Sequence, residues 1–144
     1  MTKIRRMKLE DVELVHNLGI GEKRFAVGGE EVAFWTKEQL TNWVKSEKDV
    51  LLIAEQNEQI IGYALSQYHS PTRKATYENL YVIPEYRNQG IARKLTSELI
   101  KQLKEKKSYI CGLIEADNEL IVKILEENGF KKGKQMIWMD YQSE

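Results

Sequence analysis

"YVIPEYRNQGIARKL", residues 81–95, decides the fold of this chain, because it predicts the end of a strand, a turn and the start of a helix. The residues just before it, "ATYENLYVI", are typical of a strand. Pro84 follows them, and its ring cannot continue a sheet ladder. Beyond the turn, Ile91, Leu95 and Leu99 recur at helical spacing. The stretch therefore predicts a β–turn–α unit.

The turn itself is a candidate anion site. The first amides of a helix have no carbonyl partners, and they converge with the positive end of the helix dipole. Gly90 has no Cβ and lets a phosphate approach the backbone, and Arg87 adds a permanent positive charge. The turn lacks the Gly-Lys-Ser/Thr ending of a P-loop and the three glycines of a dinucleotide fingerprint. It therefore indicates a phosphate cradle of another kind.

Working outward toward the N-terminus, the sequence predicts a short strand at "KIRRM" and a helix over "KLEDVELVHNLG" that Gly19 ends. A glycine-rich loop follows, and Thr36 then caps a second helix whose Leu40, Trp43 and Val44 face inward. From Val50 two apolar runs, "VLLIAEQ" and "IIGYALSQYH", have the spacing of an antiparallel hairpin.

Toward the C-terminus the same order recurs. We expect a strand at "SYICGLIEA", a helix capped by Asp117 or Asn118 and ended by Gly129, and a closing strand at "KQMIWMDY". Cys111 alternates with Tyr109 and Leu113 along what we expect to be a core strand, so we interpret it as a buried structural thiol. The chain is expected to form one α/β domain, residues 1–144, with a mixed, mostly antiparallel twisted sheet and helices on both faces.

Composition narrows the function classes. Lys plus Arg and Asp plus Glu both number 22 in 144 residues, so no net basic field favours nucleic acid or membrane as a partner. There is no membrane-length apolar run or signal peptide, and Cys111 has no internal disulfide partner. We expect a cytoplasmic protein. His16 has no second ligand at a metal-binding spacing, so we expect no metal.

"LYVIPEYRNQGIARKLTSELI" closely resembles the signature of the GNAT superfamily of N-acetyltransferases, in which Arg/Gln-x-x-Gly-x-Gly/Ala follows a strand. Arg87, Gly90 and Ala92 occupy the three defining places. The order of elements along most of the chain is also similar to that family. The resemblance implies an enzyme that moves an acetyl group from acetyl-CoA to a primary amine of a small molecule or a peptide, by direct attack in a ternary complex.

The resemblance also implies which residues hold acetyl-CoA. Its pyrophosphate would lie on the turn, and its pantetheine arm would run beside the strand before it. The implied contacts are Leu80, Tyr81, Val82, Arg87, Asn88, Gln89, Gly90, Ile91 and Ala92. Asn118 matches an asparagine that often contacts the pantetheine in the family, and it can equally be a helix cap. We expect the family's strand bulge within "LYVIP".

For catalysis, the candidate base is Glu78 in "YENLYV", where related enzymes often place an acidic residue. A backbone amide near Leu80 or Tyr81 is the candidate oxyanion donor. The family's usual proton-donating tyrosine is replaced by Leu125. Tyr81 is our candidate for that role, with Tyr77 and Tyr109 left open.

The acceptor site is the least determined part. Phe25, Phe34 and Trp35 are candidate substrate contacts, although plain packing explains them as well. The surrounding loop mixes Lys23 and Arg24 with Glu30 and Glu31, so it indicates no single charge class. Leu113 stands where the ribosomal-protein branch of the family has an acidic residue, which argues against that branch. Two further hypotheses stay open: exposed strands could pair in a homodimer, and the chain could be a noncatalytic acyl-CoA-binding or sensing module.

Overall fold

The protein structure is a computed structural model that describes residues 1–22, 25, 34–141 and 143. Its elements follow the expected order as far as the last helix. They are β1 (Lys3–Arg6), α1 (Val12–Ile20), α2 (Lys37–Val44), β2 (Leu51–Gln56), β3 (Gln59–His69), β4 (Lys74–Val82), α3 (Ile91–Glu105), β5 (Tyr109–Gly112) and α4 (Glu119–Glu127), with 3-10 turns η1 (Leu9–Asp11) and η3 (Pro84–Tyr86). Within those ranges no helix has the length and apolarity needed to cross a bilayer.

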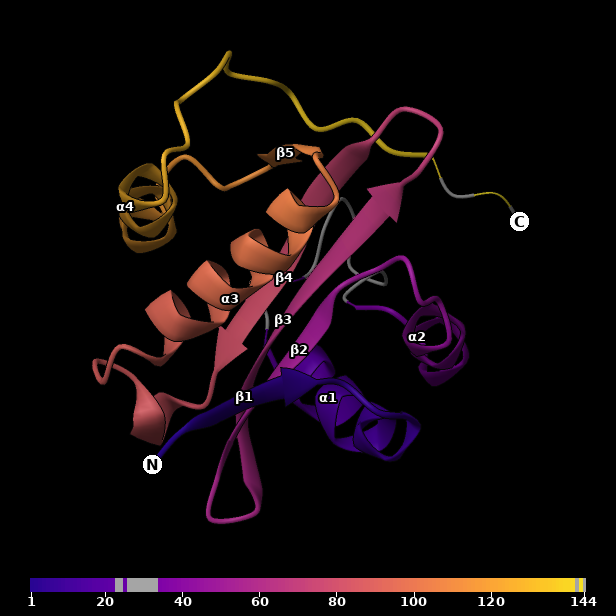
Figure 1. Cartoon of the computed structure of the whole chain (residues 1–144), viewed down its shortest axis with the longest axis vertical. Coiled ribbons are helices and arrows are strands. Elements are labelled where there is room, and N and C mark those ends of the chain that lie inside the picture. The colour runs from indigo at the N-terminus through magenta and orange to yellow at the C-terminus, as the bar shows by residue number, and fades with distance from the viewer. Residues whose placement is uncertain (23–24, 26–33, 142, 144) are drawn as a thin grey trace.

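The five strands form one sheet in the order β1–β2–β3–β4–β5 (Figure 1). The first three pairings are antiparallel, and β4 pairs with β5 in parallel, across the crossover made by α3. Asn57 and Glu58, with φ of 51° and 63°, make the tight β2–β3 turn. The prediction of a mixed, mostly antiparallel sheet is therefore confirmed.

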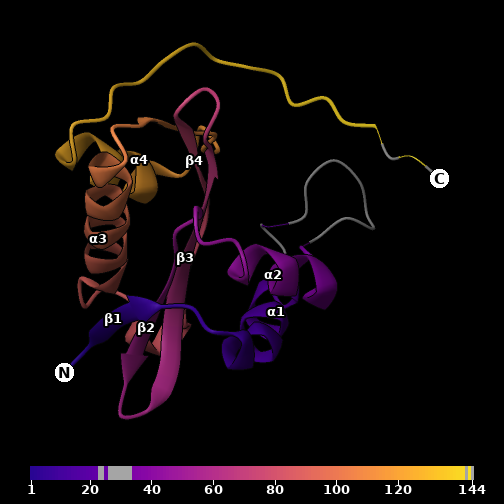
Figure 2. The ribbon, with the colours of Figure 1, turned by 45° about the vertical axis from the view of Figure 1, so that its right-hand side comes forward.

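Helices cover both faces of this sheet, as expected. Figure 2 shows α1 and α2 on one side and α3 and α4 on the other. Alternate residues of β2 divide between them: Leu52 joins the core cluster under α3, whereas Ile53 joins the cluster under α1 and α2. Because both faces are buried, β2 reads as a continuous apolar run.

The helix ends are mostly where the sequence placed them. Thr36 caps α2 by accepting a hydrogen bond from the Gln39 backbone N–H at 3.1 Å, and the Gln39 side chain accepts in return from the Thr36 N–H at 2.9 Å. The expectation that Gly19 ends the first helix is wrong. Gly19 lies inside α1, and a Cβ there would come within 2.2 Å of the Phe34 ring. This glycine serves a close packing contact and does not terminate the helix.

The strand β5 is shorter than expected and lies at the edge of the sheet. Tyr109 and Leu113 are 70% and 62% exposed, and Cys111 is half-buried. The expectation of a core strand with a fully buried thiol is therefore wrong. Alternation of apolar residues identified the strand, but it could not show that one side of this strand has no neighbour.

The expected closing strand at "KQMIWMDY" is also absent. Residues 134–141 belong to no helix or strand, and all eight are exposed. Strand propensity alone does not make a strand, because the backbone must also find a partner edge. In Figure 1 this segment runs from α4 past the end of the sheet and toward the tip of the β3–β4 hairpin.

Candidate active site

The turn between β4 and α3 has the geometry of an anion cradle. Asn88 and Gly90 are left-handed, with φ of 62° and 77°. Gly90 is the N-cap of α3, and no side chain caps the helix there or adds an acidic group to its first turn. A Cβ on Gly90 would meet nothing within 4 Å, so the space before the turn is open. The first amides of α3 thus face an open, electropositive position.

Arg87 ties this turn to the end of β4. Its Nε donates a hydrogen bond to the Val82 carbonyl at 2.8 Å, and its guanidinium carbon lies 5.6 Å from the centre of the Tyr81 ring. One terminal nitrogen lies 3.9 Å from a Glu22 carboxylate oxygen. The Arg87 side chain is 47% exposed. The positive charge of Arg87 therefore lies between the cradle and Tyr81. Its ion pair with Glu22 is long and partly exposed to solvent, so it is weak enough to rearrange.

The strand β4 carries a bulge, but not in the stretch where we expected it. Leu65 of β3 pairs with Asn79 and Ser66 pairs with Tyr77, so Glu78 is the extra residue. The expected position, within residues 80–84, is therefore wrong. No glycine marks the bulge, so the sequence carries no local signal for it.

The bulge changes which side chains face which helix layer. Tyr77 joins the α3 cluster, and beyond the bulge Leu80 and Val82 pack against the same cluster. Tyr81 packs instead against the cluster under α1 and α2. An unbroken strand would have placed Tyr77 and Tyr81 on one face. The bulge thus brings Tyr81 to the side of the aromatic residues from the N-terminal half.

The sheet pairing of β4 also changes at the bulge. Lys74–Tyr77 pair with β3 on one side and with β5 on the other. In the described residues, β5 pairs with nothing beyond Tyr77, so residues 79–82 are held by β3 alone. Their outer edge opens beside the cradle. This separation of β4 from β5 leaves backbone groups for a ligand to bind.

Glu78 lies at this point of separation. It is half-buried, and burial raises the pKa of its carboxyl group above the ordinary value. A carboxylate with a raised pKa holds an accepted proton more firmly than an ordinary surface glutamate does. Its environment therefore suits proton transfer, the role that we predicted for it.

The structure separates the three tyrosines left open as proton donors. Tyr77 is buried, hydrogen-bonded to Thr96 Oγ1 at 3.1 Å, and its pKa is raised by burial. Tyr109 pairs with Lys74, at the end of β4 away from the cradle. Tyr81 is half-exposed, adjoins Arg87 and lies on the open half of β4. Leu125 is buried under α3 as a core residue.

Phe25, Phe34 and Trp35 form an aromatic cluster that reaches Tyr81. Phe25 lies edge-on to Tyr81 at 6.1 Å between ring centres and packs on Phe34 at 6.0 Å. Phe34 contacts Trp35 at 5.1 Å. Tyr63 stacks on Tyr81 at 5.8 Å. The cluster packs on the core under α1 and α2 and also borders the open half of β4, so both roles left open by the sequence fit these contacts.

Two polar groups of the neighbouring helices have structural partners. Asn118 is half-buried and caps α4, accepting a hydrogen bond from the Ile121 N–H at 3.3 Å. Arg93 pairs with Glu127 of α4, with Nε 3.0 Å from a carboxylate oxygen. Capping leaves the amide nitrogen of Asn118 for a further contact, whereas Arg93 joins two helices on the outer surface. The loop residues Lys23, Arg24, Glu30 and Glu31 lie outside the described residues.

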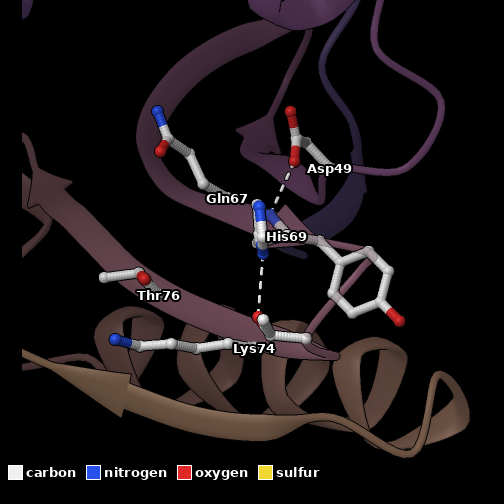
Figure 3. A pocket seen from close by; sticks show the side chains of 7 residues that line it. Asp49, Gln67, His69, Lys74 and Thr76 are labelled. Atoms are coloured by element: carbon white, nitrogen blue, oxygen red, sulfur yellow. Dashed lines mark hydrogen bonds between the residues drawn. The ribbon is translucent and has the colours of Figure 1, made fainter.

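A pocket of about 440 Å³ lies at the opposite end of β4, near the β3–β4 hairpin (Figure 3). Its polar side chains bond within the hairpin region: His69 Nδ1 lies 2.8 Å from Thr72 Oγ1, and Asp49 accepts from the Tyr68 N–H at 2.7 Å. These bonds account for the arrangement of its polar groups. The pocket is separate from the cradle, and we assign it no role.

Several solved structures with similar folds are acetyltransferases. The PaiA N-acetyltransferase of Thermoplasma acidophilum, in complex with coenzyme A, is 23% identical with a TM-score of 0.79, covering 94% of this chain and 93% of its own. The ribosomal-protein-S18-alanine N-acetyltransferase of Escherichia coli is 21% identical with a TM-score of 0.72, covering 93% and 80%. An aminoglycoside acetyltransferase from an uncultured soil metagenomic sample is 19% identical with a TM-score of 0.73, covering 99% and 97%.

A search of curated proteins found no match. The sequence pattern of the acetyltransferase (GNAT) family matches residues 20–130, well over half of the chain. This match confirms the resemblance carried by Arg87, Gly90 and Ala92, and with it the prediction of an acetyltransferase enzyme. The chain belongs to the acetyltransferase (GNAT) family.

Proposed function

We propose that this protein transfers an acetyl group from acetyl-CoA to a primary amine of a small molecule or peptide, by direct attack in a ternary complex. The observation that carries the proposal is the junction of two features: an uncapped helix start at Gly90, and the open edge of β4 beyond Glu78. The first suits the phosphates of a coenzyme A ester, and the second suits its amide-containing arm.

The turn at Gly90 suits a pyrophosphate group, because Gly90 leaves open space and no side chain caps the first amides of α3. The residues that would hold it are the backbone amides of 87–92. Leu80, Tyr81 and Val82 would offer backbone groups to the pantetheine arm, and the Asn118 amide nitrogen would reach it from α4. Coenzyme A in the T. acidophilum relative supports this choice of cofactor.

When bound, acetyl-CoA supplies an acyl group activated as a thioester. The protein must remove a proton from the acceptor amine, since an alkyl amine with a pKa of about 10.4 is only about one part in a thousand neutral near pH 7.4. That deficit corresponds to about 4 kcal/mol. Glu78, whose pKa burial raises, would accept the amine proton, directly or through water.

The negative charges that develop on the oxyanion and on the departing thiolate would be stabilised or neutralised by groups on the same half of β4. A backbone N–H near Leu80 or Tyr81 would donate to the developing oxyanion. The Tyr81 hydroxyl would return a proton to the departing thiolate. Arg87 lies over the Tyr81 ring and helps to hold the phenol on the open half of β4.

The acceptor would enter on the side of the aromatic cluster. Phe25 contacts Tyr81, Phe34 packs on Phe25, and Trp35 contacts Phe34. The E. coli structure is a ribosomal-protein-S18-alanine N-acetyltransferase and the metagenomic one an aminoglycoside acetyltransferase, so the fold accommodates both protein and small-molecule acceptors. We therefore place the acceptor only as a primary amine, and we expect the reaction to take place in the cytoplasm.

A second candidate is a noncatalytic acyl-CoA-binding or sensing module. Leu125 favours it, because a buried leucine occupies the position at which many family members carry the donor tyrosine. Such a module would bind acyl-CoA at the same cradle, but Glu78 and Tyr81 would transfer no proton.

Turnover separates the two. We would measure free thiol released from acetyl-CoA across polyamines, amino acids, aminoglycosides and short peptides, after subtracting the thiol of Cys111. Release in proportion to one added amine supports the transferase and names its acceptor class. Tight acetyl-CoA binding with no release across the panel favours the sensing module.

A further inference from the structure

Glu22 is a carboxylate held in place beside the aromatic cluster. Its backbone N–H donates to the Gly19 carbonyl at 3.2 Å, and its own carbonyl accepts from the Phe25 N–H at 3.1 Å. Its side chain is 25% exposed, whereas the ion-paired glutamates Glu10 and Glu13 are 76% and 75% exposed. Glu22 is therefore withdrawn from solvent and fixed next to Phe25, unlike an ordinary surface glutamate.

The Glu22 carboxylate lies on the same face of the sheet as Tyr81. Phe25, which its backbone holds, contacts the Tyr81 ring at 6.1 Å. Burial raises the pKa of the Tyr63 hydroxyl, and the charges of Tyr81 and Glu22 raise it further, so the carboxylate lies near that hydroxyl. Tyr63 in turn stacks on Tyr81. Glu22 thus borders the side on which the acceptor would enter.

Asn79 places a second oxygen on this face. Asn79 pairs with Leu65, and Tyr81 pairs with Tyr63. Residues directly opposite one another in an antiparallel pair point to the same face, and Leu65 packs in the cluster under α1 and α2. The Asn79 Oδ1 is buried and accepts no hydrogen bond within the described part of the chain. Such an oxygen favours a ligand that brings an N–H donor.

These groups share a preference for positive charge. A carboxylate, an amide oxygen and aromatic ring faces all attract a cation. Arg87 shows that the combination holds one, because its guanidinium lies over the Tyr81 ring and 3.9 Å from the Glu22 carboxylate. The surface beside Tyr81 therefore suits a cationic group, which Arg87 supplies in this structure.

Arg87 can give up this position when the cradle is filled. Its ion pair with Glu22 is long and partly exposed, so it is weak. Charge-assisted hydrogen bonds from a guanidinium to phosphate are stronger and often bidentate. Arg87 would therefore turn toward a pyrophosphate in the cradle, and Glu22 would take a cationic group of the acceptor in its place.

We propose that Glu22, with Asn79 beside it, binds a second cationic group of the acceptor, so that the preferred acceptors are aliphatic diamines and polyamines. The inference rests on the proposed function and names the acceptor class of that same site. The rings of Phe25 and Tyr81 offer an apolar wall that suits a methylene chain between two amines. Because the acceptor and Arg87 compete for Glu22, coenzyme A and the acceptor should each tighten the binding of the other.

The first test compares acceptors of one length: 1,4-diaminobutane, butylamine and 4-aminobutyrate, which end in an ammonium, a methyl group and a carboxylate. We expect kcat/KM for amine-dependent CoA release to be about tenfold higher for diaminobutane than for butylamine, and lowest for 4-aminobutyrate. Glu22→Gln removes the charge and keeps the shape, so it should abolish most of this preference. Comparing the ratio between variants cancels the intrinsic reactivities of the amines.

The matched control is Glu10→Gln. The Glu10 carboxylate lies 3.9 Å from Lys8 Nζ, the same distance as in the pair of Glu22 with Arg87, but it is far more exposed. This variant should keep the wild-type preference for diaminobutane.

Titration calorimetry gives a readout without turnover. Glu22→Gln should bind acetyl-CoA at least as tightly as the wild type, because it removes a competitor for Arg87. Coenzyme A, which carries no acetyl group, should tighten diaminobutane binding about tenfold in the wild type and little in Glu22→Gln.

The outcomes separate this inference from the proposed function. CoA release from none of the amines would contradict the proposed reaction, and the acceptor class with it. Acetylation of butylamine with a diaminobutane preference that is absent, or that Glu22→Gln leaves unchanged, would overturn the acceptor class alone. Weaker acetyl-CoA binding by Glu22→Gln would overturn the exchange of Arg87 for the acceptor.

Discussion

The two halves of β4 are one continuous strand with different surroundings. Residues 74–77 pair on both sides, and Ala75 and Tyr77 are almost fully buried. Residues 79–82 pair with β3 alone, Glu78 is unpaired, and most of residues 78–82 are half-exposed. The change takes place at one inserted residue, Glu78. The first half is fixed within the sheet, and the second half offers the open edge at which we propose that the reaction takes place.

The difference teaches how a sheet can gain a binding edge without losing its core. The bulge at Glu78 keeps Leu80 and Val82 packed under α3 while the strand parts from β5. Gly62 allows this, because a Cβ on it would come within 2.6 Å of the Tyr81 carbonyl. The open edge is thus held in place from the β3 side.

The largest effect should come from Glu78→Gln on the open half. The amide cannot accept the amine proton, so we expect amine-dependent CoA release to fall by about 10²-fold or more. The measurement is kcat/KM for the best acceptor of the amine panel. Glu105→Gln, an exposed glutamate at the far end of α3, is the control and should keep full activity.

Stability should not explain that loss. Burial raises the pKa of Glu78, so the folded state binds the proton more tightly than the unfolded state does. Its stabilising effect is present at acidic pH and is lost as pH rises through the raised pKa. At neutral pH the glutamine variant should therefore unfold at the same temperature as the wild type or slightly higher. A lower melting temperature would contradict the assignment.

Tyr81→Phe should have the next largest effect. Loss of the hydroxyl should lower kcat by about tenfold to a hundredfold, less than loss of the base, because a thiolate is a good leaving group. Its stacking partner Tyr63 provides the matched control. The Tyr63 hydroxyl is buried and has no hydrogen-bond partner among the described residues, so Tyr63→Phe should leave kcat unchanged. Equal effects of the two changes would rule out Tyr81 as the acid.

Gly90→Ala sharpens the comparison at the cradle. The left-handed φ of 77° should cost about 1–2 kcal/mol of folding free energy. Gly129→Ala, at φ 89° and also in open space, should cost the same. Only the Gly90 variant should also weaken acetyl-CoA binding, by about tenfold, measured by titration calorimetry. Equal affinities in both variants would place the phosphates elsewhere.

The smallest effect should come from residues 74–77, the half of β4 that pairs with strands on both sides. Tyr77→Phe removes the buried hydrogen bond to Thr96 and should lower the unfolding free energy by about 1 kcal/mol. Chemical denaturation measures this. Because Tyr77 faces α3 and not the open edge, kcat/KM should not change. A loss of activity in Tyr77→Phe would show that the two halves are not separate in function.

Much of this arrangement could be predicted from the sequence. Pro84, Gly90 and the spacing of Ile91, Leu95 and Leu99 placed the strand, turn and helix, since each acts through local geometry. The cap at Thr36 was predicted for the same reason, and of the two predicted caps of α4, Asp117 and Asn118, the structure uses Asn118.

The rest depends on neighbours that are distant in sequence. The bulge at Glu78 is defined by its pairing with Leu65 and Ser66, and no local residue signals it. Gly19 looked like a helix end, but it makes room for the Phe34 ring. Residues 134–141 carry strand propensity but pair with no strand of the sheet, which a pattern within the segment cannot reveal.

Hydrogen exchange with and without coenzyme A tests the central claim most directly. The account predicts that ligand slows exchange of the backbone amides of residues 78–82 and 87–92. Exchange of Lys74–Tyr77, which are already paired on both sides, should not change. Tight binding that leaves residues 78–92 unchanged, or that protects the hairpin end of β4 instead, would contradict the account.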